Sequence, residues 1–478
     1  MSNSSKLIAV VKRDCPTCVL VLPVLHDIER RGHSLEVHVE DDPSFAAGLS
    51  TVHDASDLGV SYRLDVHAVP TVIRLEEGRE AARAVGWNRE EWRALTGIAD
   101  LGADLPAFRP GCGSRTQEPG MRSRLKVHFG NTGLAARRVS LPESADAAEA
   151  CFDRGWTDGL PVVPPTEERV LDMLDGTTRS PQDVVGLVPP NNVPCTVEKV
   201  AINAVMAGCK PEYMPVVLTA IEAALAPECG LHAILATTNA VAPVVMVNGP
   251  IARAVGMNSK GNVFGQGNRA NAAIGRALQL VVRNVGGGRP GEIDRAVFGN
   301  PGKYTFCFAE DEEDDDWESF AASRGFAPAA STVTVFPGDG VTPIVDHMSR
   351  TPEDLCRSYV GCLRAVYNAG QVVSVSAFLV VGREHFIVFR DAGWSKQRVW
   401  DHLMENTTIP VRDIVSGRAG AFGLSPEEQA DPDRPIRKFA RGNFNIIRAG
   451  GHAGKYSAII SSIGSNDALV PVTREIRP

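Results

Sequence analysis

The sequence predicts a mixed α/β protein made of a small N-terminal domain and a larger C-terminal domain. In the first hundred residues, apolar runs of strand length alternate with stretches of helical apolar spacing. A stretch rich in glycine, proline and polar residues (102–124) then interrupts both patterns. From about residue 144, capped helices and apolar segments follow, separated by Asn- and Gly-rich turns. We therefore expect domains at 1–101 and 144–478, joined by a linker at 102–143.

The elements of the N-terminal domain are expected in the order β-α-β-α-β-β-α. "KLIAVV" (6–11) has the length and apolar character of a buried strand. Cys15 stands where the first helix begins, and helical apolar spacing runs through 19–32. "SLEVHVEDD" (34–42) alternates like a strand. A strand follows Pro70, a second strand follows the turn "EEGRE", and "NREEWRALTGIADL" is an amphipathic helix.

Composition and charge limit the classes of function. The 478 residues are 44% hydrophobic and carry a net charge of −8, so we expect no nucleic-acid partner. The first apolar stretch is too short for a signal peptide, and no run reaches the roughly 18 apolar residues of a membrane span. We therefore expect a cytoplasmic protein without a membrane partner, in which the ten cysteines are mostly reduced.

The stretch "DCPTCVLVLP" (14–23) contains a close cysteine pair, Cys15 and Cys18. The pair could be redox-active, could form half of a metal site, or could be purely structural. A metal site needs two more ligands, and the sequence has no second C-x-x-C and no H-x-x-H, so we expect no metal and no cofactor. A thiolate at a helix N-terminus is favoured by unpaired backbone N–H groups, which makes Cys15 the expected nucleophile and Cys18 the resolving thiol.

Together, the C-x-x-C pair, a proline five positions after its second cysteine (Pro23) and the later "VPT" motif resemble the thioredoxin-like family. The resemblance covers about 100 residues. It implies a cis Pro70 that packs against the disulfide and a Val69 backbone offered to a bound partner. The sequence departs from thioredoxin in having Asp14 before the first cysteine, where like charge raises a thiol pKa. It also has Ala9 at the position of the buried acid, so a dedicated partner is expected rather than general protein reduction.

Two further cysteines are candidate thiols. Cys112 lies in the linker between two glycines, and is either an exposed cysteine without a role or a mobile thiol that exchanges with the Cys15/Cys18 pair. Cys209 lies in "AGCKPEY" beside Lys210, whose charge would favour a thiolate, or is a small core residue.

The C-terminal domain contains two Gly-rich loops that could bind an anion. "FGQGNRANAAIGRAL" leads into a helix whose first turn carries Asn268, Arg269 and Asn271; it could seat a phosphate or carboxylate, or be a turn with an asparagine cap. "AGGHAGKYSAII" places Lys455 near an expected helix start. The acidic run "EDEEDDDWE" (310–318) is expected to be a solvated loop rather than a cation site.

Segments of the C-terminal domain resemble a second family. "GWTDGLPVVPPTEERV", "AINAVMAGCKPEYMPVV" and "NGPIARAVGMN…GNRANAAIGRAL" are similar to bacterial proteins encoded beside, or fused to, UGSC-type (seleno)proteins. The resemblance covers most of 145–330 and implies a setting of thiol or selenol chemistry. "CGSR" at 112–115 matches half of the UGSC motif but lacks its final cysteine.

These observations predict a thiol-dependent oxidoreductase that acts on a small organic substrate, expected to be anionic. Electrons would pass between Cys15/Cys18 and a second thiol site, with Asn268, Arg269, Asn271 and Lys455 orienting the substrate. A reductant or redox protein is a further possible partner. The alternatives are a lyase, hydrolase or sulfur-inserting enzyme whose thioredoxin-like domain delivers sulfur or docks a partner, and a noncatalytic binding partner of a redox protein.

Overall fold

The computed structural model of the chain describes residues 5–314, 316–372, 374–415, 417, 420–421, 423–464 and 468–477. It confirms the mixed α/β fold class, since helices accompany sheets that contain both parallel and antiparallel strand pairs. The chain forms two compact units. The N-terminal unit comprises Met1–Gly133 and Glu167–Asp172, and the large unit comprises Leu134–Thr166 and Met173–Pro478.

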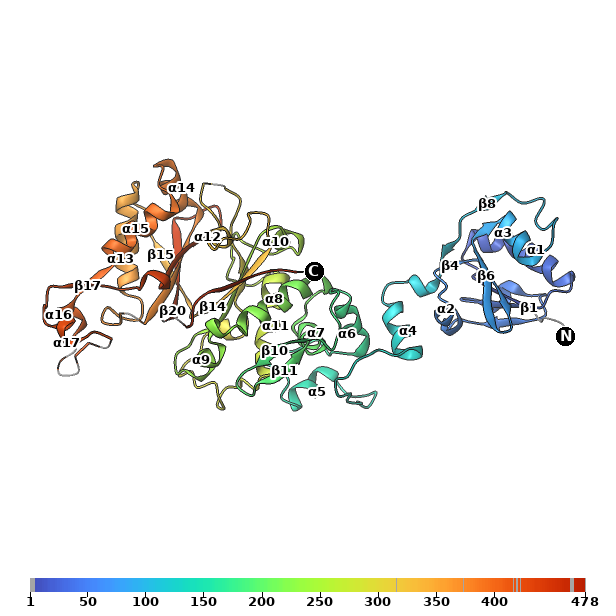
Figure 1. Cartoon of the computed structure of the whole chain (residues 1–478), viewed down its shortest axis with the longest axis horizontal. Coiled ribbons are helices and arrows are strands. Elements are labelled where there is room, and N and C mark those ends of the chain that lie inside the picture. Colours follow the sequence, from blue (N-terminus) through green and yellow to red (C-terminus); the bar gives the residue numbers. More distant parts are fainter. Residues whose placement is uncertain are drawn as a thin grey trace. The chain divides into compact units, whose positions relative to one another are not determined.

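The N-terminal unit is built on a five-stranded sheet in the order β3-β2-β1-β5-β6 (Figure 1). Its strands are β1 Ser5–Val11, β2 Leu35–Val39, β3 Val52–Asp54, β5 Thr71–Glu76 and β6 Arg79–Val85. β1, β2 and β3 run parallel, whereas β5 is antiparallel to both β1 and β6. The expected strands at 6–11 and 34–42 and after Pro70 are confirmed; β3 was not predicted.

The helices of this sheet are α1 Pro16–Arg30, α2 Gly59–Arg63 and α3 Arg89–Thr96, and η1 Pro43–Ala46 is a single 3₁₀ turn. Helix α1 begins at Pro16 because Cys15 caps it and because proline fits the first helical turn. Its apolar side chains belong to the same buried core as the side chains of β1 and β2. Helix α3 begins with an Asn88 cap and ends at Gly97 in the left-handed conformation.

The segment 102–133 folds onto the N-terminal unit, so this unit extends beyond residue 101. Two short strand pairs hold it: β7 Trp87–Asn88 with β8 Phe108–Arg109, and β4 Ala68–Val69 with β9 Cys112–Gly113. Trp87 also donates from Nε1 to the Pro106 carbonyl at 2.6 Å. The 3₁₀ turn η2 (Arg115–Gln117) and helix α4 (Met121–Phe129) follow.

The large unit contains two four-stranded sheets with the same pairing pattern. The first has the order β13-β12-β14-β21 and the second β19-β16-β20-β15. In each, the second strand pairs in parallel with the first and antiparallel with the third, and the fourth is antiparallel to the third. The strands are β12 Ala242–Asn248, β13 Cys307–Ala309, β14 Thr332–Gly338, β15 Val341–Val345, β16 Val375–Val381, β19 Phe444–Arg448, β20 Tyr456–Ile463 and β21 Val472–Glu475.

The two sheets of the large unit exchange their edge strands. The chain leaves β14 of the first sheet and continues into β15 of the second, and it leaves β20 of the second and continues into β21 of the first. A shared apolar core lies between them, in which the rings of Phe336 on β14 and Phe378 on β16 stack at 3.9 Å. The two sheets therefore have the same strand topology, and the chain passes from one to the other at these two points.

The helices that follow α4 along the chain are labelled in Figure 1, and most of the helix at Glu167–Leu174 (Glu167–Asp172) belongs to the N-terminal unit. They are α5 Ala147–Asp153, α6 Glu167–Leu174, α7 Val197–Ala207, α8 Met214–Ala224, α9 Leu231–Ala236, α10 Pro250–Ala254, α11 Arg269–Asn284, α12 Phe320–Ser323, α13 Pro352–Arg364, α14 Arg383–Asp391, α15 Lys396–Asn406, α16 Val411–Ile414 and α17 Pro426–Gln429. The remaining elements are the strand pairs β10 Val184–Val188 with β11 Val193–Thr196 and β17 Thr408–Pro410 with β18 Pro435–Arg437, and the 3₁₀ turns η3 Pro211–Tyr213, η4 Pro227–Cys229, η5 Pro301–Lys303 and η7 Arg441–Asn443.

Across the described residues, no single helix is long and apolar enough to cross a membrane. One consecutive pair, Pro211–Ala224 with Pro227–Ala236, reaches that length and composition together, but it is bent by 71°.

Candidate functional site

Cys15 lies at the N-cap of α1, as the sequence predicted. Its Sγ accepts a hydrogen bond from the Cys18 backbone N–H at 3.3 Å and, as a thiol, donates to the Val69 carbonyl at 3.4 Å. The hydrogen bond from the Cys18 side chain is the largest influence and, with the Cys112 thiol and backbone N–H groups, it outweighs burial and lowers the pKa of Cys15 to about 5. Asp14, which was expected to raise the pKa of Cys15, is not among the main influences on it. Cys15 is therefore a thiolate at neutral pH.

Cys18 lies one turn inside α1 and has the opposite character. It is fully buried, and burial together with the neighbouring Cys15 raises its pKa far above the ordinary thiol value. The Lys12 backbone N–H lies 3.5 Å from its sulfur. The two cysteines thus differ as a nucleophile and a resolving thiol should, with only the outer one ionised.

The structure brings the linker cysteine to the same place. Strand β9 pairs with β4 so that Cys112 is directly opposite Val69. The Cys112 thiol hydrogen-bonds to the sulfur of Cys15, and burial first, then this neighbour, raises the pKa of Cys112. Three thiols, one on the helix cap, one inside the helix and one on the docked linker, therefore form a single cluster.

The segment 102–133, called the docked segment below, also covers Cys15. Cys15 is only 1% exposed, whereas Cys112 is half-buried. Thr17 Oγ1 donates to the Pro110 carbonyl at 2.7 Å, and Lys12 Nζ donates to the Gly113 carbonyl at 2.8 Å. The backbone at Gly111 comes so close to Val69 that a Cβ on Gly111 would lie 2.9 Å from the Val69 oxygen. An external reagent therefore meets Cys112 before it meets Cys15.

A buried carboxylate anchors the segment just after Cys112. Glu40, which follows β2, is fully buried and accepts hydrogen bonds from Ser114 Oγ at 2.5 Å and from Ser61 Oγ at 2.7 Å. It also accepts from the Arg115 backbone N–H at 2.9 Å. Glu40 was not predicted from the sequence, because two of its partners, Ser114 and Arg115, lie more than 70 residues away in a stretch with the composition of a linker.

The Val69–Pro70 peptide bond is cis. Pro70 therefore has the conformation that the resemblance to thioredoxin-like proteins implied for it. Val69 lies beside Cys15 and offers its backbone, and in this chain β9 takes that position.

Cys209 lies in the other unit and has no feature of a nucleophile. It is 6% exposed, and burial raises its pKa to about 12. Lys210, which was expected to favour its thiolate, instead pairs with Glu212 at 3.4 Å. The other described cysteines of the large unit share the raised pKa caused by burial: Cys151, Cys195, Cys229, Cys307, Cys356 and Cys362.

Asn268, Arg269 and Asn271 lie at the start of α11, and their side chains hold the surrounding loop. Asn268 caps the helix and its Oδ1 accepts from the Asn271 N–H at 2.9 Å. Arg269 Nε donates to the Gly208 carbonyl, and the Asn271 amide bonds the backbone of Asn258 on both its oxygen and its nitrogen. The arrangement is that of a capped turn, with most of these polar groups already occupied.

Lys455 does not lie near a helix start. It immediately precedes strand β20, which pairs with β15 and β16, and its carbonyl accepts from the Asp346 N–H at 3.2 Å. The expectation of a helix there was wrong, because the residues after Lys455 form this strand. The loop before β20 meets the α11 loop, since the Gly450 N–H donates to the Ser259 carbonyl at 2.9 Å.

The large unit has a cavity of about 640 Å³ at the ends of β12, β13 and β19. It is lined by acidic residues of the 310–318 run and by Arg253, Lys396 and Arg448. This run was expected to be a solvated loop, yet Glu310 and Asp311 are 5% and 6% exposed; Asp315 lies outside the described residues. Asn268, Arg269, Asn271 and Lys455 are not among the residues that line it.

Two acidic groups of this cavity, Glu310 and Asp311, already accept hydrogen bonds from neighbouring residues. Glu310 accepts from Asn248 Nδ2 at 2.6 Å and from the Phe320 N–H at 2.7 Å, and burial raises its pKa. Asp311 accepts from Lys260 Nζ at 2.6 Å. Burial also lowers the pKa of Lys396, which donates to the Glu318 carbonyl at 3.0 Å.

Comparison of the sequence with protein-family models finds no match, and comparison with curated proteins finds none either.

Proposed function

We propose that the chain is a thiol–disulfide oxidoreductase whose N-terminal unit is a thioredoxin-like domain. The observation that carries the proposal is the cluster of an ionised Cys15, a protonated Cys18 and the docked Cys112. The strand order β3-β2-β1-β5-β6, with the cysteine pair at the start of the helix after β1, supports the family resemblance. A thiolate held at a helix N-terminus beside a protonated thiol is the arrangement that disulfide exchange requires.

Cys112 is the immediate partner of Cys15 in this proposal. An external disulfide R–S–S–R first exchanges with the half-buried Cys112, which passes its proton to the hydrogen-bonded Cys15 thiolate as it attacks. The departing R–S⁻ takes this proton back from Cys15 and leaves as R–SH, and a mixed disulfide remains on Cys112. The Cys15 thiolate then attacks the Cys112 sulfur, so that the Cys15–Cys112 bond forms and the second R–S⁻ leaves and takes a proton.

Cys18 completes the transfer. Its sulfur attacks Cys15, the Cys15–Cys18 bond forms, and Cys112 leaves as a thiolate. Because the pKa of Cys112 is raised, Cys112 takes up the proton that Cys18 loses. Two electrons have then passed from the Cys15/Cys18 pair to the disulfide, and an external dithiol returns the pair to the reduced state.

The test uses a stoichiometric amount of Ellman's reagent on the fully reduced chain at pH 6, where ordinary thiols are protonated. We expect the wild type to release both aromatic thiolates of each reagent molecule in a fast phase. Cys112→Ser should slow this phase, because Cys15 is covered, and Cys15→Ser should stop it after the first thiolate. Cys362→Ser, a half-buried cysteine of the large unit, is the matched control. Full release of both thiolates by Cys15→Ser would contradict the proposal.

For the substrate, we propose that a small organic anion binds in the cavity of the large unit. The acidic groups Glu310 and Asp311 are already hydrogen-bonded, whereas Arg253 and Lys396 form no salt bridge within 4 Å to any described residue. Among the cations that line the cavity, Arg253 and Lys396 are therefore the groups that a carboxylate or phosphate could pair with. This favours a small-molecule substrate over a purely noncatalytic docking role.

Phosphate and acetate titrations can test this part. Trp317 lines the cavity, so we expect its fluorescence to change with the anion in the wild type and to respond much more weakly in Lys396→Gln. Lys199→Gln, which alters a half-buried lysine of the same unit that does not line the cavity, is the control and should respond like the wild type. An equal response in Lys396→Gln would contradict anion binding at this cavity.

A further inference from the structure

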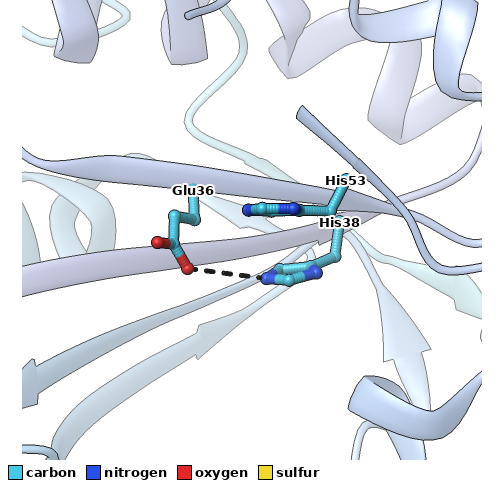
Figure 2. Close-up of side chains that lie close together, drawn as sticks. All are labelled: Glu36, His38 and His53. Carbon is cyan, nitrogen blue, oxygen red and sulfur yellow. Dashed lines mark ion pairs between the residues drawn. The ribbon is translucent and has the colours of Figure 1, made fainter. Parts of the chain in front are cut away.

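Two histidines and a glutamate meet on one face at the edge of the N-terminal sheet. His38 on β2 and His53 on β3 are direct partners in the parallel pair, and Glu36 precedes His38 by two residues, which places all three on the same face. The two imidazole rings stack with centroids 4.8 Å apart and planes at 19° (Figure 2). One ligand atom of each residue lies within 4.8 Å of the other two.

The His38 ring lacks the hydrogen bonds that a buried imidazole usually makes. His38 is 9% exposed, and its Nδ1 is buried without a hydrogen-bond partner among the described residues. Its Nε2 faces Glu36 Oε2 at 3.9 Å, as Figure 2 shows, which is too long for a hydrogen bond. Nε2, the nitrogen that faces Glu36, therefore has no hydrogen-bond partner among the described residues and can bind a ligand between the two side chains.

The carboxylate of the cluster keeps one oxygen for a ligand. Lys6 Nζ contacts Glu36 Oε1 at 2.5 Å, which fixes the carboxylate and leaves Oε2 directed toward His38. Glu36 Oε2 and the facing His38 Nε2 are therefore placed to share one ligand.

We propose that Glu36, His38 and His53 bind one divalent transition-metal ion of the zinc class, bridging strands β2 and β3. Two imidazole nitrogens and one carboxylate oxygen are a donor set that zinc accepts, whereas Mg²⁺ and Ca²⁺ prefer oxygen ligands. Bonds of roughly 2.0–2.1 Å put ligand atoms about 3.4 Å apart, so ligand atoms that now lie up to 4.8 Å apart approach by up to about 1.4 Å. The exposed His53 supplies that movement by side-chain rotation. Three protein ligands leave room for water or a small anion in the remaining coordination position.

Co²⁺ is the probe of choice, because the cysteines of this chain could also bind a soft metal. A nitrogen and oxygen site gives visible d–d bands without the near-ultraviolet charge-transfer band of a thiolate–cobalt bond. We expect the reduced full-length chain to bind one Co²⁺ with such a spectrum, to release it on addition of Zn²⁺, and to gain thermal stability with bound metal.

Variants decide which residues bind the ion. His53→Ala and Glu36→Gln change residues at the surface edge of the sheet and should weaken Co²⁺ binding by at least about tenfold. His33→Ala, a nearby half-buried histidine outside the cluster, is the matched control and should bind like the wild type. Unchanged binding in His53→Ala, or a thiolate charge-transfer band in the wild type, would overturn the proposal. The circular dichroism of each variant checks that it is folded.

Discussion

The ionisation of Cys15 is the property on which exchange depends, and replacing its two thiol neighbours tests it. A pKa of about 5, instead of the 9.0 of an ordinary cysteine, makes the thiolate about a hundredfold more abundant than the thiol at pH 7, where an unperturbed cysteine would show about the reverse ratio. The hydrogen bond from Cys18 is the largest cause and that from Cys112 is smaller. We therefore expect Cys18→Ala to raise the pKa of Cys15 strongly and Cys112→Ala to raise it less.

Ultraviolet absorbance of the thiolate, followed against pH in a phosphine reductant, measures this pKa without requiring a reagent to reach the covered sulfur. The difference between the wild type and Cys15→Ser isolates the titration of Cys15, and Cys362→Ala is the control. Stability gives a second readout with a fixed sign. Because the folded pKa is depressed, the contribution of Cys15 is complete above the unfolded thiol pKa and is lost as pH falls through about 5. A Cys15 titration above pH 8, or one that Cys18→Ala leaves unchanged, would refute the reasoning.

Three further predictions concern the docked segment, Cys209 and a buried lysine. Gly111→Ala places a Cβ 2.9 Å from the Val69 oxygen and should loosen β9, so Cys15 should react faster with iodoacetamide; Gly113→Ala, which has open space at its Cβ, should not change the rate, and equal rates in both variants would contradict the docking argument. Cys209 should resist alkylation until the protein unfolds, because it is buried with a pKa of about 12; peptide mapping that finds it labelled in the native protein would contradict this. Burial lowers the pKa of Lys438 to about 8, so stability measured by denaturant titration should rise from about pH 8 to 10 in the wild type but not in Lys438→Met. The same pH slope in both proteins would contradict that shift.

The local elements of the N-terminal unit were predictable because periodicity and capping signals are local. Cys15 at a helix start, the strands at 6–11 and 34–42, and the strand after Pro70 all follow from residues within a few positions of one another. β3 was missed, because three residues give too short a pattern to recognise.

The long-range parts of the candidate site could not be predicted in the same way. A linker rich in glycine and proline gives no sign that Ser114 will find a buried Glu40 74 positions away, so the docking of Cys112 appears only in three dimensions. His38 and His53 are likewise 15 positions apart and meet only through strand pairing. The repeated sheet topology of the large unit also escaped detection, because the exchanged edge strands separate each copy in the sequence.

For the candidate residues of the large unit, the sequence pattern fits two interpretations. Asn268 and Asn271 are residue types that occur in anion sites, but the same residue types also form capped turns, and the structure contains such a turn. Cys209 has a cation beside it in the sequence, yet burial, which the sequence does not reveal at a helix break, determines its pKa.

The measurement that tests the central claim most directly is disulfide mapping of the full-length chain after mild oxidation, by intact mass and then by peptide mass spectrometry. We expect a loss of two mass units that dithiothreitol reverses, caused by a Cys15–Cys18 disulfide bond in the wild type. We also expect a Cys15–Cys112 bond in Cys18→Ser and no bond within this cluster that involves position 15 in Cys15→Ser. If oxidation of the wild type leaves these three cysteines unpaired, or if Cys18→Ser fails to trap Cys112, the three-thiol exchange centre is contradicted.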